Sequence, residues 1–365
     1  MTTADHEFMA LALRLAQRGM WTAHPNPRVG CVIVADGNVV GQCWHERAGE
    51  PHAEVLALAA AGDRAAGSTA YVTLEPCCHQ GRTPPCTESL IKAGVTRVVF
   101  AAEDPDPRVA GGGARALTAG GIAVQGGLMA AESRALNPGF ISRMERQQPW
   151  VRTKIAASLD GRVALADGSS HWISSEASRQ DSHRLRARSS AILTGIGTVL
   201  ADDPELTVRL PLPAGFVQPE RIVLDSRLRT PPSARLLRAA GVTRLITTVD
   251  DARLRATLEA TGAVVQVVPE QDGRPDLAAI LSSLAAGGVN ELMVEAGPRL
   301  NGALLDAGLI DEIVYYLAPQ VIGAAGLGMF EGRVLTDMFE RHAFELADSR
   351  RVGPDLRLRF LRKAN

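Results

Sequence analysis

The chain has 365 residues, of which 46% are hydrophobic and 22% are charged, a length and composition that suit about two domains at ~150 residues each. Its 39 basic and 40 acidic residues give a net charge of −1, so we expect neither nucleic acid nor an anionic membrane surface as a partner. No uninterrupted apolar run approaches the ~18 residues of a membrane span, and the N-terminal segment MTTADHEF lacks the basic residues of a signal peptide, which predicts a cytoplasmic protein.

The first part of the chain alternates helical and strand-like patterns. Apolar residues at helical spacing predict a helix over 4–17, and two apolar runs, 29–35 and 39–44, predict a β-hairpin. Further elements follow in order: a helix over 51–61, a strand over 70–74, a helix ending near residue 94, a strand over 95–101, a helix over 115–119 and a strand over 122–124. This alternation predicts an α/β layered domain.

The polar segment 143–149, RMERQQP, interrupts the apolar pattern and predicts a domain boundary. We therefore assign residues 1–148 to a first domain and residues 149–365 to a second. The second domain is also predicted to be α/β, with helical stretches between strands at 151–157, 191–194, 221–224, 244–248, 264–268, 291–295 and 313–317.

All five cysteines lie in the first quarter of the chain, at Cys31, Cys43, Cys77, Cys78 and Cys86. An odd number of cysteines without an export signal disfavours a disulfide framework and leaves metal ligation or ordinary burial. We expect Cys31 and Cys43, which stand in strand-like segments, to be buried apolar side chains.

Four residues around the predicted strand 70–74 form a pattern typical of a zinc site. His52 begins a predicted helix, and Cys77 and Cys86 follow the strand with the spacing P-C-x8-C. One imidazole and two thiolates leave the fourth position of a zinc ion open to water, whose pKa falls toward ~7 on coordination. Glu54, two residues after His52, is then placed to take the proton of that water and pass it to departing ammonia.

This His/Glu/Pro-Cys/Cys arrangement is that of the zinc nucleobase deaminases, and it predicts one catalytic zinc ion per chain. The alternative is a closed structural zinc site that uses Cys78 or His79 as the fourth ligand. We leave Cys78 outside the site, because the side chains of adjacent residues rarely point at one ion.

Two glycine turns in the second domain suggest that it binds the phosphates of a cofactor. Gly195 and Gly197 follow a predicted strand but supply only half of the G-x-G-x-x-G fingerprint, since Leu200 occupies the third glycine position. They still allow backbone amides and the Thr198 hydroxyl to approach a phosphate group. A second such turn, at Gly297, follows another predicted strand.

Several short motifs in a fixed order carry a family resemblance over nearly the whole chain. In the first domain they are HPNPRVG, WHERAGEPHAE, CHQGRTPP and EDPDPRVAGGG; in the second they are KIAASLDGRVA, HWIS, LTGIGTVLADDPELTVR and VEAGPRL, with LNPGF near the boundary. Together they resemble the bifunctional riboflavin-biosynthesis deaminase/reductases. The resemblance implies an α/β chain with an N-terminal cytidine-deaminase-like zinc domain followed by a dihydrofolate-reductase-like domain.

The resemblance also implies two consecutive reactions. The first domain would deaminate 2,5-diamino-6-(5-phosphoribosylamino)pyrimidin-4-one by zinc-dependent hydrolysis. The second would use NADPH to reduce the ribose of 5-amino-6-(5-phosphoribosylamino)uracil to a ribityl chain. Hydride transfer needs alignment and a dry pocket, so no single residue is expected to be a decisive catalyst there.

By motif match, the resemblance further implies binding residues in both domains. In the first domain Asn26 would hold the pyrimidine edge, His45 and His79 would line the pocket, and Asp104 is a minor candidate. In the second domain the implied NADPH contacts are Ala156, Trp172, Thr198, Asp202, Ser226, Gly297, Pro298 and Arg299. The implied substrate contacts there are Ser170, Arg186, Leu206, Arg209 and Glu295.

Three of these positions, together with Ala296 before Gly297, carry more detailed expectations. Arg186 and Arg209 would form a guanidinium fork around the substrate phosphate. Trp172 would either stack on a flat ring or fill the edge of a core. Ala296 stands where the family has the first glycine of a pair, and its methyl group would restrict the closest approach of a phosphate.

Two other functions remain open from the sequence. The chain could be a monofunctional zinc deaminase for another base, with the second half serving as a noncatalytic dimerisation or binding module. It could also be a nucleic-acid-binding or editing protein with structural zinc, although the neutral net charge and the 4% aromatic content disfavour this. For the bifunctional enzyme we expect a homo-oligomer.

Overall fold

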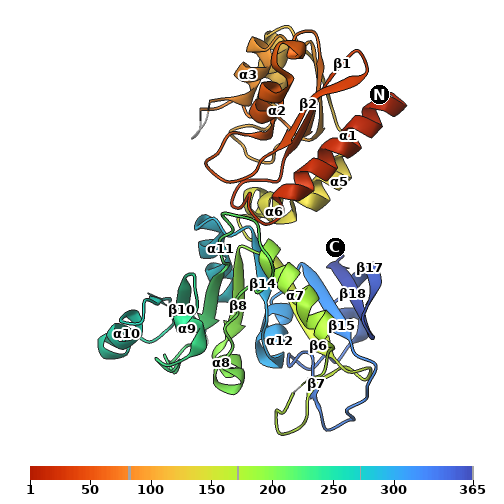
Figure 1. Cartoon of the computed structure of the whole chain (residues 1–365). Helices are drawn as coiled ribbons and strands as arrows, with labels where there is room; N and C mark the ends of the chain where they lie inside the picture. The colour runs from red at the N-terminus through yellow and green to blue at the C-terminus, as the bar shows by residue number, and fades with distance from the viewer. Residues whose placement is uncertain (81–83, 171, 272, 364–365) are drawn as a thin grey trace. The chain divides into compact units, whose positions relative to one another are not determined.

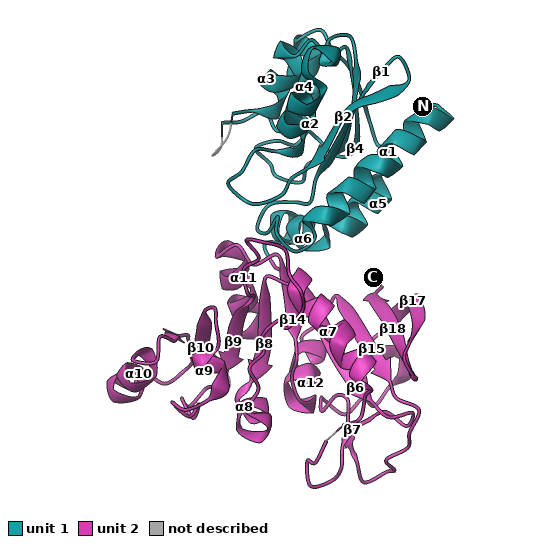
Figure 2. Ribbon diagram, viewed as in Figure 1, with its two compact units in different colours: residues 1–147 teal, residues 148–365 magenta. Residues whose placement is uncertain are grey.

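The computed structural model describes residues 1–80, 84–170, 172–271 and 273–363. It divides into two compact units, Met1–Gln147 and Gln148–Asn365 (Figure 1, Figure 2). Parts of the motifs CHQGRTPP and HWIS, at residues 81–83 and 171, lie outside the described residues. Within the described ranges, no helix has both the length and the apolar character that crossing a membrane requires.

Unit 1 is built on a five-stranded mixed sheet with the strand order β2-β1-β3-β4-β5. Its strands are β1 (Gly30–Ala35), β2 (Asn38–Trp44), β3 (Thr69–Leu74), β4 (Arg97–Ala102) and β5 (Ala123–Gly126). β1 pairs antiparallel with β2 and β3, whereas β3, β4 and β5 are parallel. These strands confirm the predicted ones, each of which is a short apolar run next to turn residues.

Helices cover both faces of this sheet. They are α1 (Thr3–Ala16), α2 (Ala53–Ala61), α3 (Cys86–Lys92), α4 (Gly112–Ala119), α5 (Ala130–Leu136) and α6 (Pro138–Arg146), with 3-10 turns at Gln17–Gly19 and Gly62–Ala65. Ile33 and Val72 pack with α2, α3 and α4 on one face, while Val32 and Val99 pack with α1 on the other. The central strands therefore bury both faces, which fixes their register.

The polar segment expected to be a domain boundary is partly helical. α6 continues to Arg146, so the first part of this segment forms the end of the last helix of unit 1, and unit 1 itself ends at Gln147. The helix forms because Phe140 and Ile141 bury one of its faces against the ends of β3 and β4, which leaves the polar residues on the other face. Neither α5 nor α6 is among the predicted elements.

Unit 2 is built on a nine-stranded sheet with the order β11-β10-β9-β8-β14-β6-β15-β18-β17. The strands are β6 (Trp150–Ala157), β8 (Ala191–Gly195), β9 (Glu220–Leu224), β10 (Thr243–Thr247), β11 (Val264–Val267), β14 (Glu291–Val294), β15 (Glu312–Leu317), β17 (Phe344–Val352) and β18 (Asp355–Arg362). Neighbours from β11 to β15 pair in parallel, and β18 and β17 form an antiparallel hairpin. The parallel strands confirm the prediction. The hairpin was not predicted, although the alternation in DLRLRF indicates a strand.

The helices of unit 2 also pack on both faces. They are α7 (Glu176–Arg188), α8 (Ile196–Asp202), α9 (Arg235–Arg238), α10 (Ala252–Glu259), α11 (Leu277–Ala286) and α12 (Pro298–Asp306). Smaller elements are the pairs β7 (Arg162–Ala164) with β16 (Leu327–Gly328) and β12 (Glu270–Gln271) with β13 (Arg274–Pro275), and a 3-10 turn at Met338–Glu340. Ile192 and Met293 pack against α7, and Leu193 and Leu292 pack against α11 and α12.

The order of the strands places a candidate site at one edge of the unit 2 sheet. The chain passes from β6 to β8 and outward to β11, and then returns to insert β14 between β8 and β6. The parallel strands have their carboxyl ends at the same edge, and ligands of open α/β sheets bind outside that edge where the strand order reverses. The turns that follow β8 and β14 therefore mark a candidate binding site.

Candidate active sites

Three possible metal ligands come together in unit 1. His52 Nδ1 lies 3.2 Å from Cys86 Sγ and 3.6 Å from Cys77 Sγ. The three ligand atoms all lie within 4.8 Å of one another. Zinc bonds of about 2.0 Å to nitrogen and 2.3 Å to sulfur at a tetrahedral angle separate these two atoms by about 3.5 Å. The donor set and its spacing therefore fit a zinc ion.

Two helix starts and one strand end bring these ligands together. His52 is the N-cap of α2, Cys77 follows β3, and Cys86 is the first residue of α3, whose backbone N–H points at Cys77 Sγ at 3.4 Å. The Cys86 thiol and the His52 ring lower the pKa of Cys77 to about 4, while the contact with Cys77 raises the pKa of Cys86. The geometry thus favours the thiolate form of Cys77, which is the form in which cysteine binds a metal.

Glu54 lies in the first turn of α2, beside the ligands, with 3% of its surface exposed. Burial raises its pKa, and the nearby Cys77 raises it further. A buried carboxyl next to the ligand cluster that is not itself in the cluster is suited to hold and release a proton.

Cys78 points away from the ligand cluster. Its Sγ donates to the carbonyl oxygen of Arg108 at 3.8 Å, and the metal-ligand group found among the described residues contains His52, Cys77 and Cys86 without Cys78 or His79. Cys31 is fully buried in the core and Cys43 is half-buried against it, in agreement with their expected packing role.

Asn26 and His45 lie next to the metal ligands. Asn26 Nδ2 lies 3.0 Å from His45 Nε2, and the His45 ring packs edge-on against the His52 ring at 5.3 Å. Burial and the neighbouring His52 lower the pKa of His45, which favours a neutral ring. Such a ring can donate from Nδ1 to the Pro51 carbonyl oxygen, 3.3 Å away, and accept from Asn26 at Nε2.

His79 and Asp104 lie on the two loops that follow β3 and β4. His79 is half-buried, and its buried Nδ1 has no hydrogen-bond partner in the described part of the chain. Asp104 is 8% exposed, and burial raises its pKa to about 7 even though its Oδ1 accepts from the Asp106 N–H at 2.9 Å. His79 therefore has a ring nitrogen that the described residues do not satisfy, whereas burial favours the neutral form of the Asp104 carboxyl.

In unit 2 the two glycine turns lie side by side. The Thr194 hydroxyl at the end of β8 donates to the carbonyl oxygen of Glu295 at 2.7 Å. Apart from neighbouring residues of the chain, no described atom would lie within 4 Å of a Cβ added at Gly197 or Gly297, and neither glycine has a positive φ. Because the fold itself does not demand glycine here, the open space fits a ligand that approaches the backbone closely.

Of the two arginines expected to bind the substrate phosphate, Arg186 is engaged by other groups of the protein. Arg186 donates from Nε and Nη2 to the two carboxylate oxygens of Glu295 and from Nη1 to the Thr207 carbonyl oxygen at 2.9 Å. Although burial opposes ionisation of Glu295, Arg186 and Lys154 hold its pKa at about 2. The charge of Arg186 is therefore balanced inside the protein.

Arg209 is the more accessible of the two guanidinium groups. Its side chain is 55% exposed, pairs with Glu205 at 3.3 Å, and lies at the end of the segment that contains buried Leu206. Its backbone N–H lies 3.3 Å from His183 Nδ1 on α7. The structure thus brings Arg186, Leu206, Arg209 and Glu295 into one neighbourhood.

Lys154 and His183 belong to this neighbourhood but are not among the sequence candidates. Burial lowers the pKa of Lys154, and burial together with Arg186 and Arg209 lowers that of His183 to about 4. The sequence does hold a signal for Lys154, since it is one of three lysines in the chain and stands inside a predicted strand. His183 has no comparable signal, because it is one polar residue on a polar helix.

Most residues expected to contact NADPH lie on the elements at the carboxyl edge of the sheet. Thr198 and Asp202 are on α8, Ser226 follows β9, and Gly297, Pro298 and Arg299 begin α12. Ala156 is near the end of β6, and Ser170 and Trp172 are on the segment between β7 and α7. Trp172 is 70% exposed with the Arg179 guanidinium 4.4 Å from its ring centre, so it does not fill a core edge.

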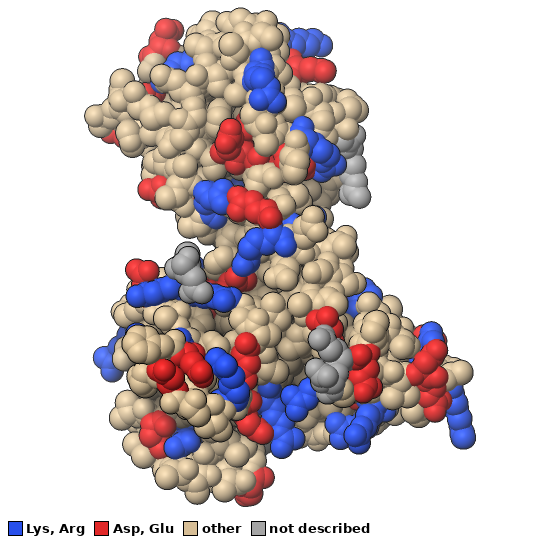
Figure 3. All heavy atoms as spheres, turned by 180° about the vertical axis from the view of Figure 1, so that it is seen from behind, with Lys and Arg blue, Asp and Glu red and all other residues tan. Residues whose placement is uncertain are grey.

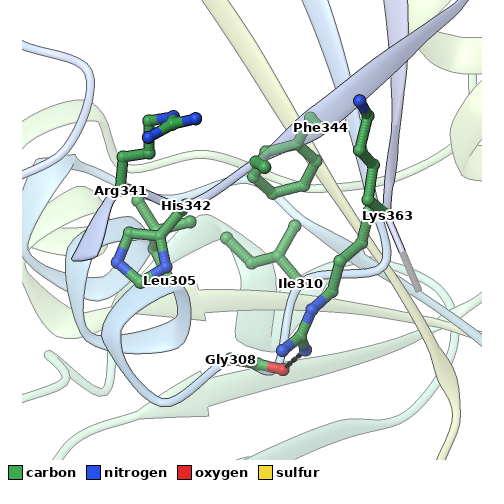
Figure 4. Close-up of a pocket in the computed structure, with 9 residues that line it drawn as sticks. Leu305, Gly308, Ile310, Arg341, His342, Phe344 and Lys363 are labelled. Atoms are coloured by element: carbon green, nitrogen blue, oxygen red, sulfur yellow. Dashed lines mark hydrogen bonds between the residues drawn. The ribbon is translucent and has the colours of Figure 1, made fainter. Parts of the chain in front are cut away.

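A separate pocket of about 130 Å³ lies among α12, β17 and β18 (Figure 4). Arg341 and Arg362 line it, but they donate to the backbone carbonyl oxygens of Met338 and Gly308. None of the residues predicted for either site lines this pocket. On the face seen in Figure 3, basic and acidic side chains are interspersed.

Family models match both units. Residues 2–102 match the cytidine and deoxycytidylate deaminase zinc-binding region, and residues 149–358 match the RibD C-terminal domain. The protein thus joins a cytidine-deaminase-like zinc domain to a reductase domain of dihydrofolate-reductase-like fold, which confirms the predicted fold class.

The wider comparisons cover nearly the whole chain. Riboflavin biosynthesis protein RibD of Escherichia coli is 48% identical over 96% of this chain and 98% of its own length. The solved structure of Acinetobacter baumannii RibD matches with a TM-score of 0.93 at 41% identity, and that of the Thermotoga maritima diaminohydroxyphosphoribosylaminopyrimidine deaminase/5-amino-6-(5-phosphoribosylamino)uracil reductase with 0.87 at 30%; each covers 99% of both chains. This chain therefore belongs to the RibD family, and it is a bifunctional deaminase and reductase of riboflavin biosynthesis.

Proposed function

We propose that the two reactions are divided between residues 1–148 and 149–365. The first domain would hydrolyse 2,5-diamino-6-(5-phosphoribosylamino)pyrimidin-4-one to the corresponding uracil and ammonia. The second would reduce the ribose of 5-amino-6-(5-phosphoribosylamino)uracil to a ribityl chain with NADPH. The observation that carries the first assignment is the cluster of His52, Cys77 and Cys86 with Glu54 buried beside it.

In the deaminase domain, His52, Cys77 and Cys86 would hold one zinc ion. Bound zinc supplies a Lewis acid that activates water at neutral pH. Glu54 would take a proton at its carboxylate and return it to the leaving amine, which is the task its burial and position suit. Asn26, held against His45, would pair with the pyrimidine edge, while His79 and Asp104 would line the remainder of the pocket.

In the reductase domain, the open glycine turns would receive the cofactor phosphates, with Thr198, Pro298 and Arg299 beside them. Bound NADPH supplies the two electrons of the reduction. The remaining proposed cofactor contacts are Ala156, Trp172, Asp202 and Ser226. The Ala296 methyl group, next to Gly297 in the chain, would limit how closely a phosphate approaches this turn.

The substrate of the reductase would lie against the charged neighbourhood around Glu295. Arg209 would take the phosphate, and Arg186 would orient Glu295 toward the sugar hydroxyls. Lys154 would donate to a sugar oxygen from the same face, and Leu206 and Ser170 would complete the contact surface. These groups position the ribose and exclude water, which is what this reduction requires of a protein.

None of the five cysteines, all of which are among the described residues, forms a disulfide, and this suits a reducing compartment such as the cytoplasm, where we place the enzyme. We further propose that it works as a homo-oligomer. Sedimentation analysis of the purified chain tests this, and a monomer at micromolar concentration would contradict it.

A two-stage assay tests the proposed function. The purified chain with zinc is given the diaminopyrimidinone phosphate, and ammonia is followed first. NADPH is then added and its oxidation is measured. Ammonia release without any NADPH oxidation would favour a monofunctional deaminase with a noncatalytic second domain, and no ammonia release would refute the deaminase assignment.

A further inference from the structure

Two exposed arginines flank a buried leucine in the turn after β9. Arg227 and Arg229 are exposed, whereas Leu228 between them is 5% exposed and packs into a core with residues of α8, α9 and β10. The Thr230 backbone N–H and hydroxyl both donate to Asp225 Oδ2 at 2.7 Å. The turn is thus anchored at Leu228 and Thr230, while Arg227 and Arg229 are exposed to solvent.

This turn lies beside the proposed phosphate turns of the cofactor. β9 pairs in parallel with β8, so its carboxyl end lies at the same edge, about 5 Å from that of β8. On the far side, the Thr248 hydroxyl after β10 donates to the Ser226 carbonyl oxygen at 3.2 Å. A dinucleotide whose phosphates occupy the turns after β8 and β14 can therefore place its adenosine half over β9 and β10.

The charges in this region are arranged to attract an anion. Among the described residues, neither Arg227 nor Arg229 forms an ion pair with a carboxylate. Of the acidic groups that follow β9 and β10, Asp225 is 0% exposed, and Asp250 pairs with Arg255 at 2.7 Å. Asp225 therefore cannot serve as the exposed carboxylate that binds the ribose diol of NADH.

We propose that Arg227 and Arg229 bind the adenosine 2′-phosphate and so select NADPH over NADH. The inference rests on the proposed reductase function and assigns a specificity role to two residues of the same site. Guanidinium groups recognise phosphate through charge-assisted, bidentate hydrogen bonds, which the 2′-hydroxyl of NADH cannot replace. This turn therefore distinguishes the 2′-phosphate of NADPH from the 2′-hydroxyl of NADH.

The test compares two probes by calorimetry on the full chain: adenosine 2′,5′-bisphosphate, which carries the 2′-phosphate, and 5′-AMP, which lacks it. We expect the wild-type protein to bind the bisphosphate more tightly. Replacing both residues, Arg227→Ala with Arg229→Ala, should weaken the bisphosphate about 30-fold and change 5′-AMP less than about 2-fold. The KM for NADPH should rise by a similar factor while that for NADH stays constant.

Arg238→Ala is the matched control. Arg238 is an exposed arginine on α9, next to the segment whose carbonyl oxygens bind Arg221 at the amino end of β9, so it lies toward the opposite edge of the sheet. This variant should bind both probes like the wild type. The single variants Arg227→Gln and Arg229→Gln, which keep polar side chains, guard against a folding defect in the double variant.

The outcomes separate this inference from the function on which it rests. A wild-type chain that binds both probes equally and oxidises NADH as well as NADPH would refute the NADPH assignment itself. A wild-type chain that prefers the bisphosphate, together with double and single variants that keep the full preference, would overturn the role of Arg227 and Arg229 and leave the reductase assignment intact.

Discussion

The candidate site of unit 1 and that of unit 2 are assembled in different ways. In unit 1 the metal ligands and Glu54 come from residues 52 to 86, at two helix starts and one strand end. In unit 2 the charged group joins Lys154, Arg186, Arg209 and Glu295 from widely separated elements. The first site depends on a few side-chain atoms that lie close together. The second depends on several positive and negative side chains that neutralise one another at the carboxyl ends of the strands.

This difference determines how each site should fail. Removing a donor in unit 1 removes the chemistry at once, since no neighbouring group can replace a metal ligand or the proton carrier. Removing a charge in unit 2 changes binding more gradually, because several groups share the substrate and cofactor. The following substitutions test that contrast.

Glu54→Gln should have the largest effect. The amide keeps the shape of the side chain but cannot accept the proton, so deamination should fall about 1000-fold while zinc remains bound. Ammonia release and elemental analysis of the same sample measure this. Glu50→Gln, at a partly exposed glutamate paired with Arg47, is the control. NADPH oxidation should be normal in both variants when 5-amino-6-(5-phosphoribosylamino)uracil is supplied directly. Deamination above a tenth of wild type would refute the proton-transfer role.

Cys86→Ser should lower zinc affinity about 100-fold, since a serine hydroxyl is a poor substitute for a thiolate. Zinc content after dialysis against a weak chelator measures the change, and the reductase reaction of the same preparation should be unaffected. Cys78→Ser is the matched control because Cys78 Sγ contacts the Arg108 carbonyl oxygen instead. Equal zinc loss in the two variants would mean that Cys78 is also a ligand.

Arg209→Ala should raise the KM for the reductase substrate about 10-fold and that for NADPH less than about 2-fold, because the lost contact is with the substrate phosphate. Steady-state kinetics with each compound varied in turn separates the two. Arg184→Ala removes an exposed arginine of α7 that pairs with Asp181 and should change neither value. Equal increases in both KM values after Arg209→Ala would place Arg209 away from the substrate phosphate.

Asp104→Asn should affect stability, and only at higher pH. Folding raises the pKa of Asp104 to about 7, so the native chain holds a proton there that the unfolded chain releases, and its stabilising contribution is lost as pH rises through that value. The stability of the asparagine variant relative to wild type should therefore rise by about 2.5 kcal/mol between pH 5 and pH 8. Thermal unfolding measures this difference, and the transition whose midpoint shifts when zinc is added is assigned to unit 1. A pH-independent difference between wild type and variant would show that Asp104 does not titrate as described.

Sequence patterns predicted the regular core strands of both units, because short apolar runs next to turn residues have few alternatives to a buried strand. They did not indicate α6, whose polar face resembles a linker, or the C-terminal hairpin, whose half-exposed strands carry alternating arginines. The clustering of His52, Cys77 and Cys86 was predictable because imidazole and thiolates at this spacing have few other uses.

The sequence alone predicted the candidate metal site, the glycine turns and an enzyme of two domains. The metal site depends on rare side chains, and the glycine turns allow a close approach to the backbone. Only the tertiary structure decided that Arg186 is balanced by Glu295, that Lys154 and His183 lie beside them, and that Arg227 and Arg229 emerge next to the cofactor turns. Charged side chains occur at many positions in a sequence. Their role depends on which neighbours the sheet order brings within reach, and that is a property of the folded chain.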